Sequence, residues 1–105
     1  MNPIAVLTTV ATLDDARRIA NALVARRLVA CAQISAIESI YTWEGAVRNE
    51  PEFRLLLKTT HARYESVERA IRDMHPYQLP AIHALRFEQV FAPYAAWIES
   101  NADGQ

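Results

Sequence analysis

Cysteine is nearly absent from the sequence: Cys31 is the only one in 105 residues. No disulfide can form within one chain, and the paired CxxC spacing of zinc ribbons and thiol redox motifs is missing. The formal net charge is −1, so no basic surface for nucleic acid or acidic membranes is indicated. The apolar run near the start is too short to cross a bilayer, and no basic leader precedes it. These absences predict a soluble cytoplasmic protein that binds neither nucleic acid nor membrane.

The length and the hydrophobic content of the chain are sufficient for one folded domain. Hydrophobic residues make up 51% of the sequence. At this length folding hides roughly two-thirds of the surface of the unfolded chain, so a core can form without a metal or a disulfide. We therefore expect a single domain over residues 1–105, in which "NADGQ" (101–105) is a flexible tail.

The spacing of hydrophobic residues alternates between the periods of strands and helices. It predicts, in order, a strand over 4–10, a helix over 13–27, strands over 28–47 and 52–60, a helix that ends at Met74, a strand over 81–87 and a short helix that Pro93 opens. "RNEP" (48–51) is typical of a turn, so the second and third strands form a long hairpin with Gly45 as a bulge. This order predicts the α+β, ferredoxin-like fold, with two helices on one face of a four-stranded antiparallel sheet.

The third predicted strand carries apolar residues on both of its faces. Leu55 and Leu57 share one face and Leu56 lies on the other. An antiparallel sheet with one face in water should alternate apolar and polar residues. Two main helices can cover only one face, so we expect the other face to contact another subunit.

Missing residues exclude several functions that this fold can host. The loop after the first strand, "TVATLDD", has neither the glycines and arginine of an acylphosphatase-like anion loop nor the two cysteines of a heavy-metal-associated domain. The inner strands offer Phe53 alone where an RNA-recognition domain needs paired aromatics. Cys31 could act as a nucleophile with His75 or His83 as its base, but a thiol in apolar strand text is typically buried and inert. We expect no enzymatic activity, and we expect the carboxylates of "WEGAVRNEPE" to be solvated.

The stretch "MHPYQLPAIH" (74–83) concentrates potential ligand atoms in a segment that two prolines stiffen. Each residue also has a structural interpretation: Met74 as a core residue, Tyr77 as a packing aromatic, and His75 as a cation at a helix C-terminus. Taken together, a rigid His-Pro-Tyr turn near a thiolate or another imidazole could bind a soft or borderline metal.

Four motifs at matching spacing resemble the CutA, or divalent-cation tolerance, family: "LVACAQI" (28–34), "SIYTWEGAV" (39–47), "LLLKTT" (55–60) and "HPYQLP" (75–80). The resemblance covers nearly the whole chain. It implies a ferredoxin-like fold, a tight homotrimer, a link to copper and divalent-cation tolerance, an architecture similar to PII signalling proteins, and no established reaction. The recurring family residues are matched here by Cys31, Tyr41, Trp43, Glu44, Lys58, His75, Pro76, Tyr77 and Pro80.

The chain departs from the family at possible donor positions, with Thr8, Met74 and Ala81 where some members carry stronger ligands. Thioether and thiol ligands are soft, which favours Cu(I) over Zn(II). The predicted metal ligands are His75, Met74 and Cys31, surrounded by Tyr77, Glu44, Trp43, Lys58 and Tyr41, and copper is the one cofactor considered. The alternative is a PII-like trimeric signalling or scaffold protein with no physiological metal.

Overall fold

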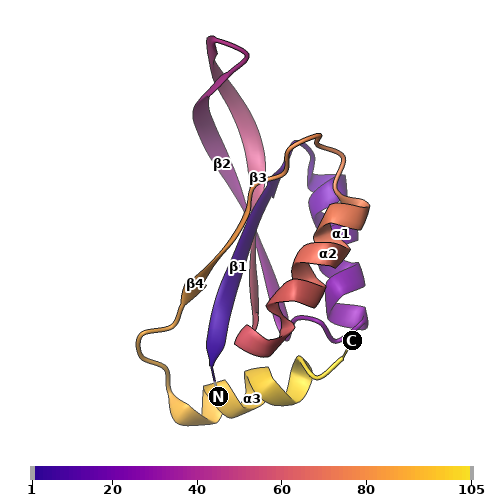
Figure 1. The fold of residues 1–105 in the computed structure, drawn as a ribbon, viewed down its shortest axis with the longest axis vertical. Coiled ribbons are helices and arrows are strands. Elements are labelled where there is room, and N and C mark those ends of the chain that lie inside the picture. The colour runs from indigo at the N-terminus through magenta and orange to yellow at the C-terminus, as the bar shows by residue number, and fades with distance from the viewer. Residues whose placement is uncertain (1, 105) are drawn as a thin grey trace.

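The structure, a computed structural model, describes residues 2–104. Its elements are β1 (Pro3–Val10), α1 (Leu13–Ala25), β2 (Cys31–Trp43), β3 (Ala46–Thr60), the short 3-10 helix η1 (His61–Arg63), α2 (Tyr64–Met74), β4 (Ile82–Arg86) and α3 (Ala92–Asn101). The four strands form one antiparallel sheet in the order β2-β3-β1-β4. Helices α1 and α2 lie against one face of this sheet (Figure 1). The predicted α+β class with a four-stranded antiparallel sheet is confirmed.

The hydrophobic core fills the layer between the sheet and these two helices. Alternate residues of a strand point to the same face, and residues three or four apart share one side of a helix. The largest fully buried core side chains are Val6 and Val10 of β1, Ile19 and Leu23 of α1, Leu55 and Leu57 of β3, Val67 and Ile71 of α2, and Leu28 and Val29 between α1 and β2. The strand period in the sequence therefore marks the sheet side of this core, and the helix period marks its helical side.

The β2–β3 hairpin turns earlier than the sequence predicted. The tight turn lies at Glu44 and Gly45, with positive φ angles of 51° and 79°, and "RNEP" (48–51) is part of β3. Two consecutive residues with positive φ are typical of the two-residue hairpin turn that matches strand twist. Pro51 is tolerated in β3 because the pairing with β1 ends at Phe53, so one edge of the strand at Pro51 has no neighbour that needs its missing N–H. Gly45 is a turn residue and not a bulge.

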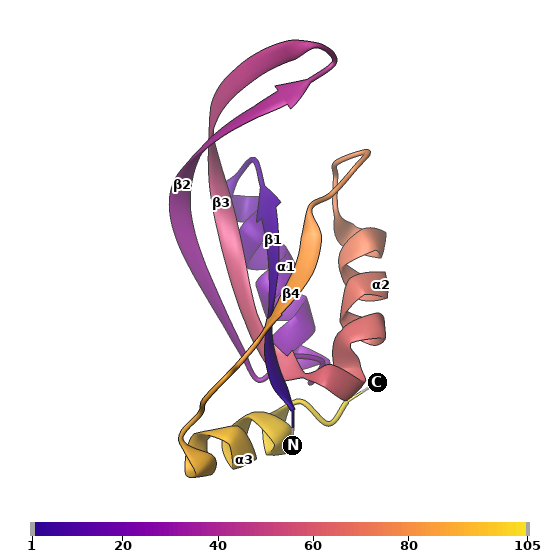
Figure 2. The same cartoon turned by 60° about the vertical axis from the view of Figure 1, so that its left-hand side comes forward.

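The hairpin extends well beyond the body of the protein and curls over (Figure 2). Its strands stay paired from Cys31 and Lys58 to Trp43 and Ala46. Within residues 2–104, no helix is long and apolar enough to span a membrane.

The C-terminal residues are packed against the body, which corrects the prediction of a flexible tail from residue 101. Asn101 ends α3, Ala102 is 2% exposed, and Asp103 accepts a hydrogen bond from Arg27 Nε at 2.5 Å. The backbone N–H of Gly104 donates to the carbonyl of Arg27 at 2.9 Å. Gln105 lies outside the described residues.

One face of the sheet is not covered by α1 and α2. Helix α3 crosses only the lower end of the molecule (Figure 1), where the hydroxyl of Tyr94 accepts a hydrogen bond from Lys58 Nζ at 3.0 Å. The strand register places Leu7, Leu56 and Leu85 on this uncovered face together with His83. Leu85 is 57% exposed. The two-sided apolar pattern of the sequence therefore leaves apolar side chains open on this face.

Candidate functional site

The His-Pro-Tyr turn begins where α2 ends. His75 has extended backbone angles (φ −78°, ψ 132°) and donates its N–H to the carbonyl of Ile71 at 2.8 Å. A residue that precedes proline is disfavoured in the helical region, so Pro76 forces the chain to leave the helix here. The side chain of His75 consequently turns back towards the end of β1.

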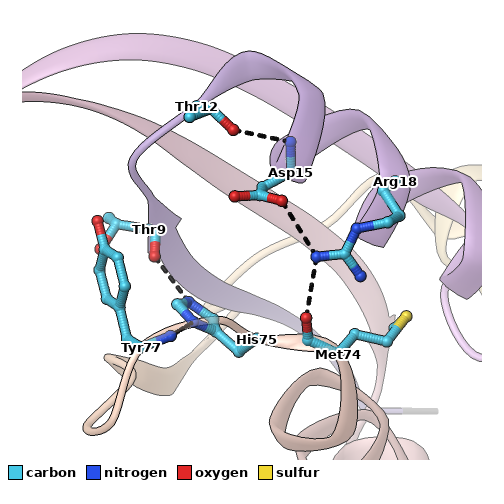
Figure 3. Close-up of polar contacts among 7 residues, drawn as sticks. All are labelled: Thr9, Thr12, Asp15, Arg18, Met74, His75 and Tyr77. Carbon is cyan, nitrogen blue, oxygen red and sulfur yellow. Dashed lines mark hydrogen bonds and ion pairs between the residues drawn. The ribbon is translucent and has the colours of Figure 1, made fainter.

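Both ring nitrogens of His75 are engaged in hydrogen bonds. Nε2 lies 2.8 Å from the carbonyl oxygen of Thr9 (Figure 3), and Nδ1 accepts the backbone N–H of Tyr77 at 3.1 Å. A carbonyl can only accept, so Nε2 carries the hydrogen and the ring is neutral. Burial lowers the pKa of His75, which favours the same neutral form. In this state the imidazole has no lone pair free for a metal.

The backbone of Met74 is held from α1. Arg18 Nη2 donates to the carbonyl of Met74 at 3.0 Å and to Asp15 Oδ1 at 3.2 Å, and Thr12 Oγ1 accepts the N–H of Asp15 at 3.1 Å (Figure 3). These bonds link the first turns of α1 to the C-terminus of α2. The thioether of Met74 points away from the ring of His75 and packs against the core (Figure 3).

The side chain of Tyr77 connects the turn to the hairpin. Its hydroxyl donates to Glu52 Oε2 at 2.6 Å, and its ring lies 4.8 Å from the ring of His75, centroid to centroid. Burial, followed by the neighbouring Glu52 carboxylate, raises the pKa of Tyr77. Glu52 is only 8% exposed. The expectation that the carboxylates of this segment are solvated is therefore wrong for Glu52.

A groove of about 670 Å³ lies between the turn, the end of β1 and the hairpin. Its lining consists of Thr9, Ala11, Ser39, Ile40, Tyr41, Trp43, Glu50, Glu52, Tyr77, Gln78, Leu79 and Ala81. Three aromatic residues of the predicted site, Tyr41, Trp43 and Tyr77, therefore come together here. The sequence-based prediction placed the carboxylates of Glu50 and Glu52 in solvent and did not name Thr9 of β1.

The other predicted site residues lie elsewhere. Cys31 stands opposite Lys58, and Lys58 stands opposite Ala5, four residues along β1 from Thr9. At about 3.4 Å per residue this offset is roughly 14 Å, so the thiol and His75 do not meet within one chain. Lys58 bonds Tyr94 on α3, and Glu44 occupies the hairpin turn.

A copper ion does not fit the predicted ligand set of a single chain. The imidazole of His75 is occupied on both nitrogens, the sulfur of Met74 points elsewhere, and Cys31 is distant. Nor do residues 2–104 contain any group of three or more His, Cys, Asp or Glu side chains that could hold a metal ion. We therefore derive no chemistry from copper at this turn.

Sequence comparison identifies the family. The chain belongs to the CutA1 divalent ion tolerance protein family, whose sequence model matches residues 4–101. The divalent-cation tolerance protein CutA of Thermus thermophilus is 39% identical over 97 residues, which are 91% of this chain and 94% of that protein. A probable divalent-cation tolerance protein cutA homolog of Encephalitozoon cuniculi is 36% identical over 101 residues, 96% of this chain and 89% of that protein. The resemblance seen in the four motifs is confirmed.

Solved structures of the family have the same fold. The periplasmic divalent cation tolerance protein CutA from Archaeoglobus fulgidus superposes with a TM-score of 0.93 at 30% identity, over 95% of this chain and 98% of that chain. The divalent cation tolerance protein from Thermus thermophilus superposes with a TM-score of 0.90 at 38% identity, over 94% and 97% of the two chains.

Proposed function

We propose that this protein acts in tolerance of divalent cations as a non-catalytic homotrimer. The family match over residues 4–101 supports the cellular role, because the relatives are named for divalent-cation tolerance. The number of subunits rests on the resemblance to a family of trimers. The element order and the sheet order β2-β3-β1-β4 support a ferredoxin-like topology for each subunit.

The observation that carries the assembly is the apolar surface left open on the sheet and hairpin. Leu85, Ile40 and Val47 are 57%, 66% and 76% exposed. The register places Leu85 on the open sheet face and Ile40 and Val47 on the opposite side of the hairpin, so both sides of the strands expose apolar surface of the kind found at interaction sites. A second chain that covers the open sheet face and the projecting hairpin would remove this surface from water.

The proposal of a non-catalytic role is supported by the separation of the reactive side chains. Cys31 lies on β2 and His83 on β4, three strand spacings or roughly 14 Å apart. His75, the other candidate base, uses both ring nitrogens in hydrogen bonds. Neither candidate base therefore lies within hydrogen-bond reach of the Cys31 thiol, as nucleophilic catalysis by this cysteine requires.

A second candidate function is trimeric signalling or scaffolding without a physiological metal, similar to PII proteins. The hydrogen bonds of His75 favour this candidate, because they give the His-Pro-Tyr turn a structural role that needs no ion. We keep the cytoplasm as the predicted location for both candidates.

Two experiments separate these candidates. The first compares growth in elevated copper, zinc and cobalt of cells with and without the gene, and we expect cells without it to be more sensitive. The second titrates the purified, tag-free protein with Cu(I) and Cu(II). Saturation near one ion per chain would support direct metal binding, whereas sensitivity of the cells without binding by the protein would support the signalling candidate. Equal growth of the two strains would contradict the tolerance role.

A further inference from the structure

Asp103 and Gly104 form the one Asp-Gly step in the chain. The sequence has four aspartates, and only Asp103 precedes a glycine. The peptide nitrogen that follows an aspartate can attack the side-chain carboxyl carbon, and glycine permits this attack best because it has no Cβ to obstruct the approach. Asp103 is exposed, whereas Ala102 before it is buried. The step therefore carries the atoms for a reaction of the chain with itself at an accessible position.

Two arginines hold this segment against the C-terminal end of α1 and against η1. Arg27 Nε donates to Asp103 Oδ1 at 2.5 Å. Arg63 donates from Nε to the carbonyl of Ala102 at 3.0 Å and from Nη2 to the carbonyl of Asp103 at 3.3 Å. The N–H of Gly104 donates to the carbonyl of Arg27 at 2.9 Å. We call residues 102–104, held in this way, the C-terminal latch.

The closed latch opposes the reaction in two ways. A carboxyl group is attacked mainly in its neutral form, and the hydrogen bond and charge of Arg27 lower the pKa of Asp103 and keep it ionised. The nitrogen of Gly104 must lose its proton to attack, and that proton lies in the hydrogen bond to the carbonyl of Arg27. A base from solvent reaches such an amide only when the bond opens. The reaction should therefore proceed from the open latch.

The latch has no room for the product of this reaction. Attack expels water and closes a succinimide ring, and water then opens the ring at either carbonyl to give aspartate or isoaspartate. Isoaspartate carries the backbone through its side-chain carbon and so inserts a methylene before Gly104. A Cβ on Gly104 would already lie 2.1 Å from the carbonyl oxygen of Arg26. The lengthened chain therefore cannot return both Gly104 and the carboxylate of residue 103 to their places.

We propose that Asp103–Gly104 is a site of spontaneous isomerisation to isoaspartate, which releases the C-terminal latch and keeps it open. When the latch opens, the nitrogen of Gly104 bonds to Asp103 Cγ, the amide proton and the carboxyl OH leave as water, and hydrolysis of the ring completes the conversion. The released segment exposes Ala102, which the closed latch buries beside Ala30 and Ile98. This site goes beyond the proposed role in divalent-cation tolerance and depends on neither a metal nor a second subunit.

Peptide mapping of the aged protein measures the reaction. No Lys or Arg follows Arg86, so trypsin releases residues 87–105, in which Asp103 is the only aspartate. Isoaspartate changes the chromatographic retention of this peptide and leaves its mass unchanged, whereas deamidation of Asn101 raises the mass. We would incubate the folded protein at one mildly acidic pH beside a synthetic peptide of residues 87–105, which has no latch. We expect the peptide to isomerise about tenfold or more faster than the protein, because a latch of several hydrogen bonds is mostly closed.

Substitution of Arg27 should speed the reaction in the folded protein. Arg27→Gln removes the charge-assisted hydrogen bond to Asp103, and we expect isoaspartate to accumulate several-fold faster than in the parent protein. Arg26→Gln removes the same charge from the neighbouring exposed residue, whose side chain is not among the donors to the latch, and should isomerise as the parent protein does. If Arg27→Gln does not fold, Arg63→Gln replaces it, because it removes the bonds to the carbonyls of Ala102 and Asp103.

Hydrogen exchange of the isomerised protein tests the release of the latch. We expect faster exchange at the amide of residue 104 than in the parent protein, while amides within α1 stay protected. Unchanged protection at residue 104 would overturn the proposal, because the latch would then accommodate isoaspartate. Equal rates of isomerisation in the folded protein and the free peptide would overturn it as well, and so would equal rates in Arg26→Gln and the folded latch variant, since the latch would then not control the reaction.

Discussion

Two buried threonines, Thr8 and Thr59, differ in whether their hydroxyl groups are hydrogen-bonded. Thr59 Oγ1 donates to the carbonyl of Leu28 at 2.7 Å. Thr8 is 1% exposed, and its Oγ1 is the one buried side-chain polar atom without a hydrogen-bond partner among residues 2–104. A buried hydroxyl that makes no hydrogen bond loses its hydration without compensation. Thr8 therefore destabilises the core in which Thr59 is well accommodated.

Replacing each threonine by valine should change stability in opposite directions. Thr8→Val keeps the shape and removes the unsatisfied hydroxyl, so we expect the free energy of unfolding to rise by about 1–2 kcal/mol. Thr59→Val leaves the carbonyl of Leu28 without its donor, so we expect a decrease of about 1–3 kcal/mol. Urea unfolding of both variants at one protein concentration measures the two changes in the free energy of unfolding. A lower midpoint for Thr8→Val would show that its hydroxyl has a stabilising partner.

The neutral state of His75 predicts a pH dependence of stability. Burial places its pKa in the folded state below the ordinary value of about 6.5. The unfolded chain then binds more protons than the folded one in this range, so the free energy of unfolding should fall as the pH is lowered from about 7 through 6.5 towards the folded pKa. Protonation would also remove the acceptor that Nδ1 offers to the N–H of Tyr77.

Substitution of single histidines tests whether His75 causes this pH dependence of stability. His75→Gln should be less stable at neutral pH, and its unfolding midpoint should change less between about pH 7 and 5.5 than that of the parent protein. His83→Gln, at an exposed position of β4, should retain the pH dependence of the parent protein. A parent-like pH dependence in His75→Gln would assign the effect to another group.

At the same scale, the sequence indicated three of the side chains that line the groove but not what they touch. The aromatic residues Tyr41, Trp43 and Tyr77 were expected near one another and line one groove. The partner of His75 is the main-chain carbonyl of Thr9, and every residue type carries such a carbonyl, so no sequence signal could have indicated it. Glu52 was misjudged because its burial depends on the covering Tyr77, a contact between segments far apart in the chain.

Among the elements, periodic segments were predicted well and the hairpin turn was not. Asn49 and Pro51 are common turn residues, so local propensity favoured a turn at 48–51. The observed turn at Glu44 and Gly45 places both residues at positive φ and keeps residues 46–60 in one strand. Strands β2 and β3 then pair with Trp43 opposite Ala46. This register brings Glu50 and Glu52 onto the same face as Tyr41.

The C-terminal segment is an element that composition alone did not identify. Its sequence, "NADGQ", lacks the apolar pattern of a packed segment, but Arg27 and Arg63 hold Ala102 and Asp103 in place. Arg27 bonds the side chain of Asp103 and the carbonyl of Ser100, and Arg63 bonds the carbonyls of Ala102 and Asp103. A Cβ at Gly104 would lie 2.1 Å from the carbonyl oxygen of Arg26, so only glycine fits there.

Gly104→Ala should therefore detach the end of the chain. We expect the free energy of unfolding to fall by about 1–3 kcal/mol, the usual cost of forced overpacking. Hydrogen exchange should show faster exchange at the amide of residue 104, which donates to Arg27, while amides within α1 exchange as in the parent protein. Unchanged protection at residue 104 would mean that the backbone shifts to accommodate the methyl group without losing the contact.

At the scale of the whole molecule, the sequence predicted a surface that the single chain leaves open. Leu55 and Leu57 are fully buried beneath the helices, while Leu56 faces the other side of the sheet and is partly exposed. The hairpin projects beyond the body, and no helix of residues 2–104 lies over its outer part (Figure 2). The identity of the partner surface cannot follow from periodicity, because alternation shows that a face is apolar and not what covers it.

If the chain assembles through this face, a charge placed on it should disrupt the assembly, whereas a charge on the helical layer should not. Leu56→Glu places a carboxylate in the middle of the uncovered face, and a stable obligate interface of well over ~2,000 Å² with core-like composition should not tolerate it. We expect the parent protein to have the mass of a trimer in multi-angle light scattering, and the Leu56→Glu variant to dissociate or become insoluble. Val24→Glu makes the same kind of change on α1, at a side chain that is 42% exposed on the helical layer, and should leave the mass unchanged. A monomer mass for the parent protein, or a trimer that persists in Leu56→Glu, would show that this face remains in contact with water.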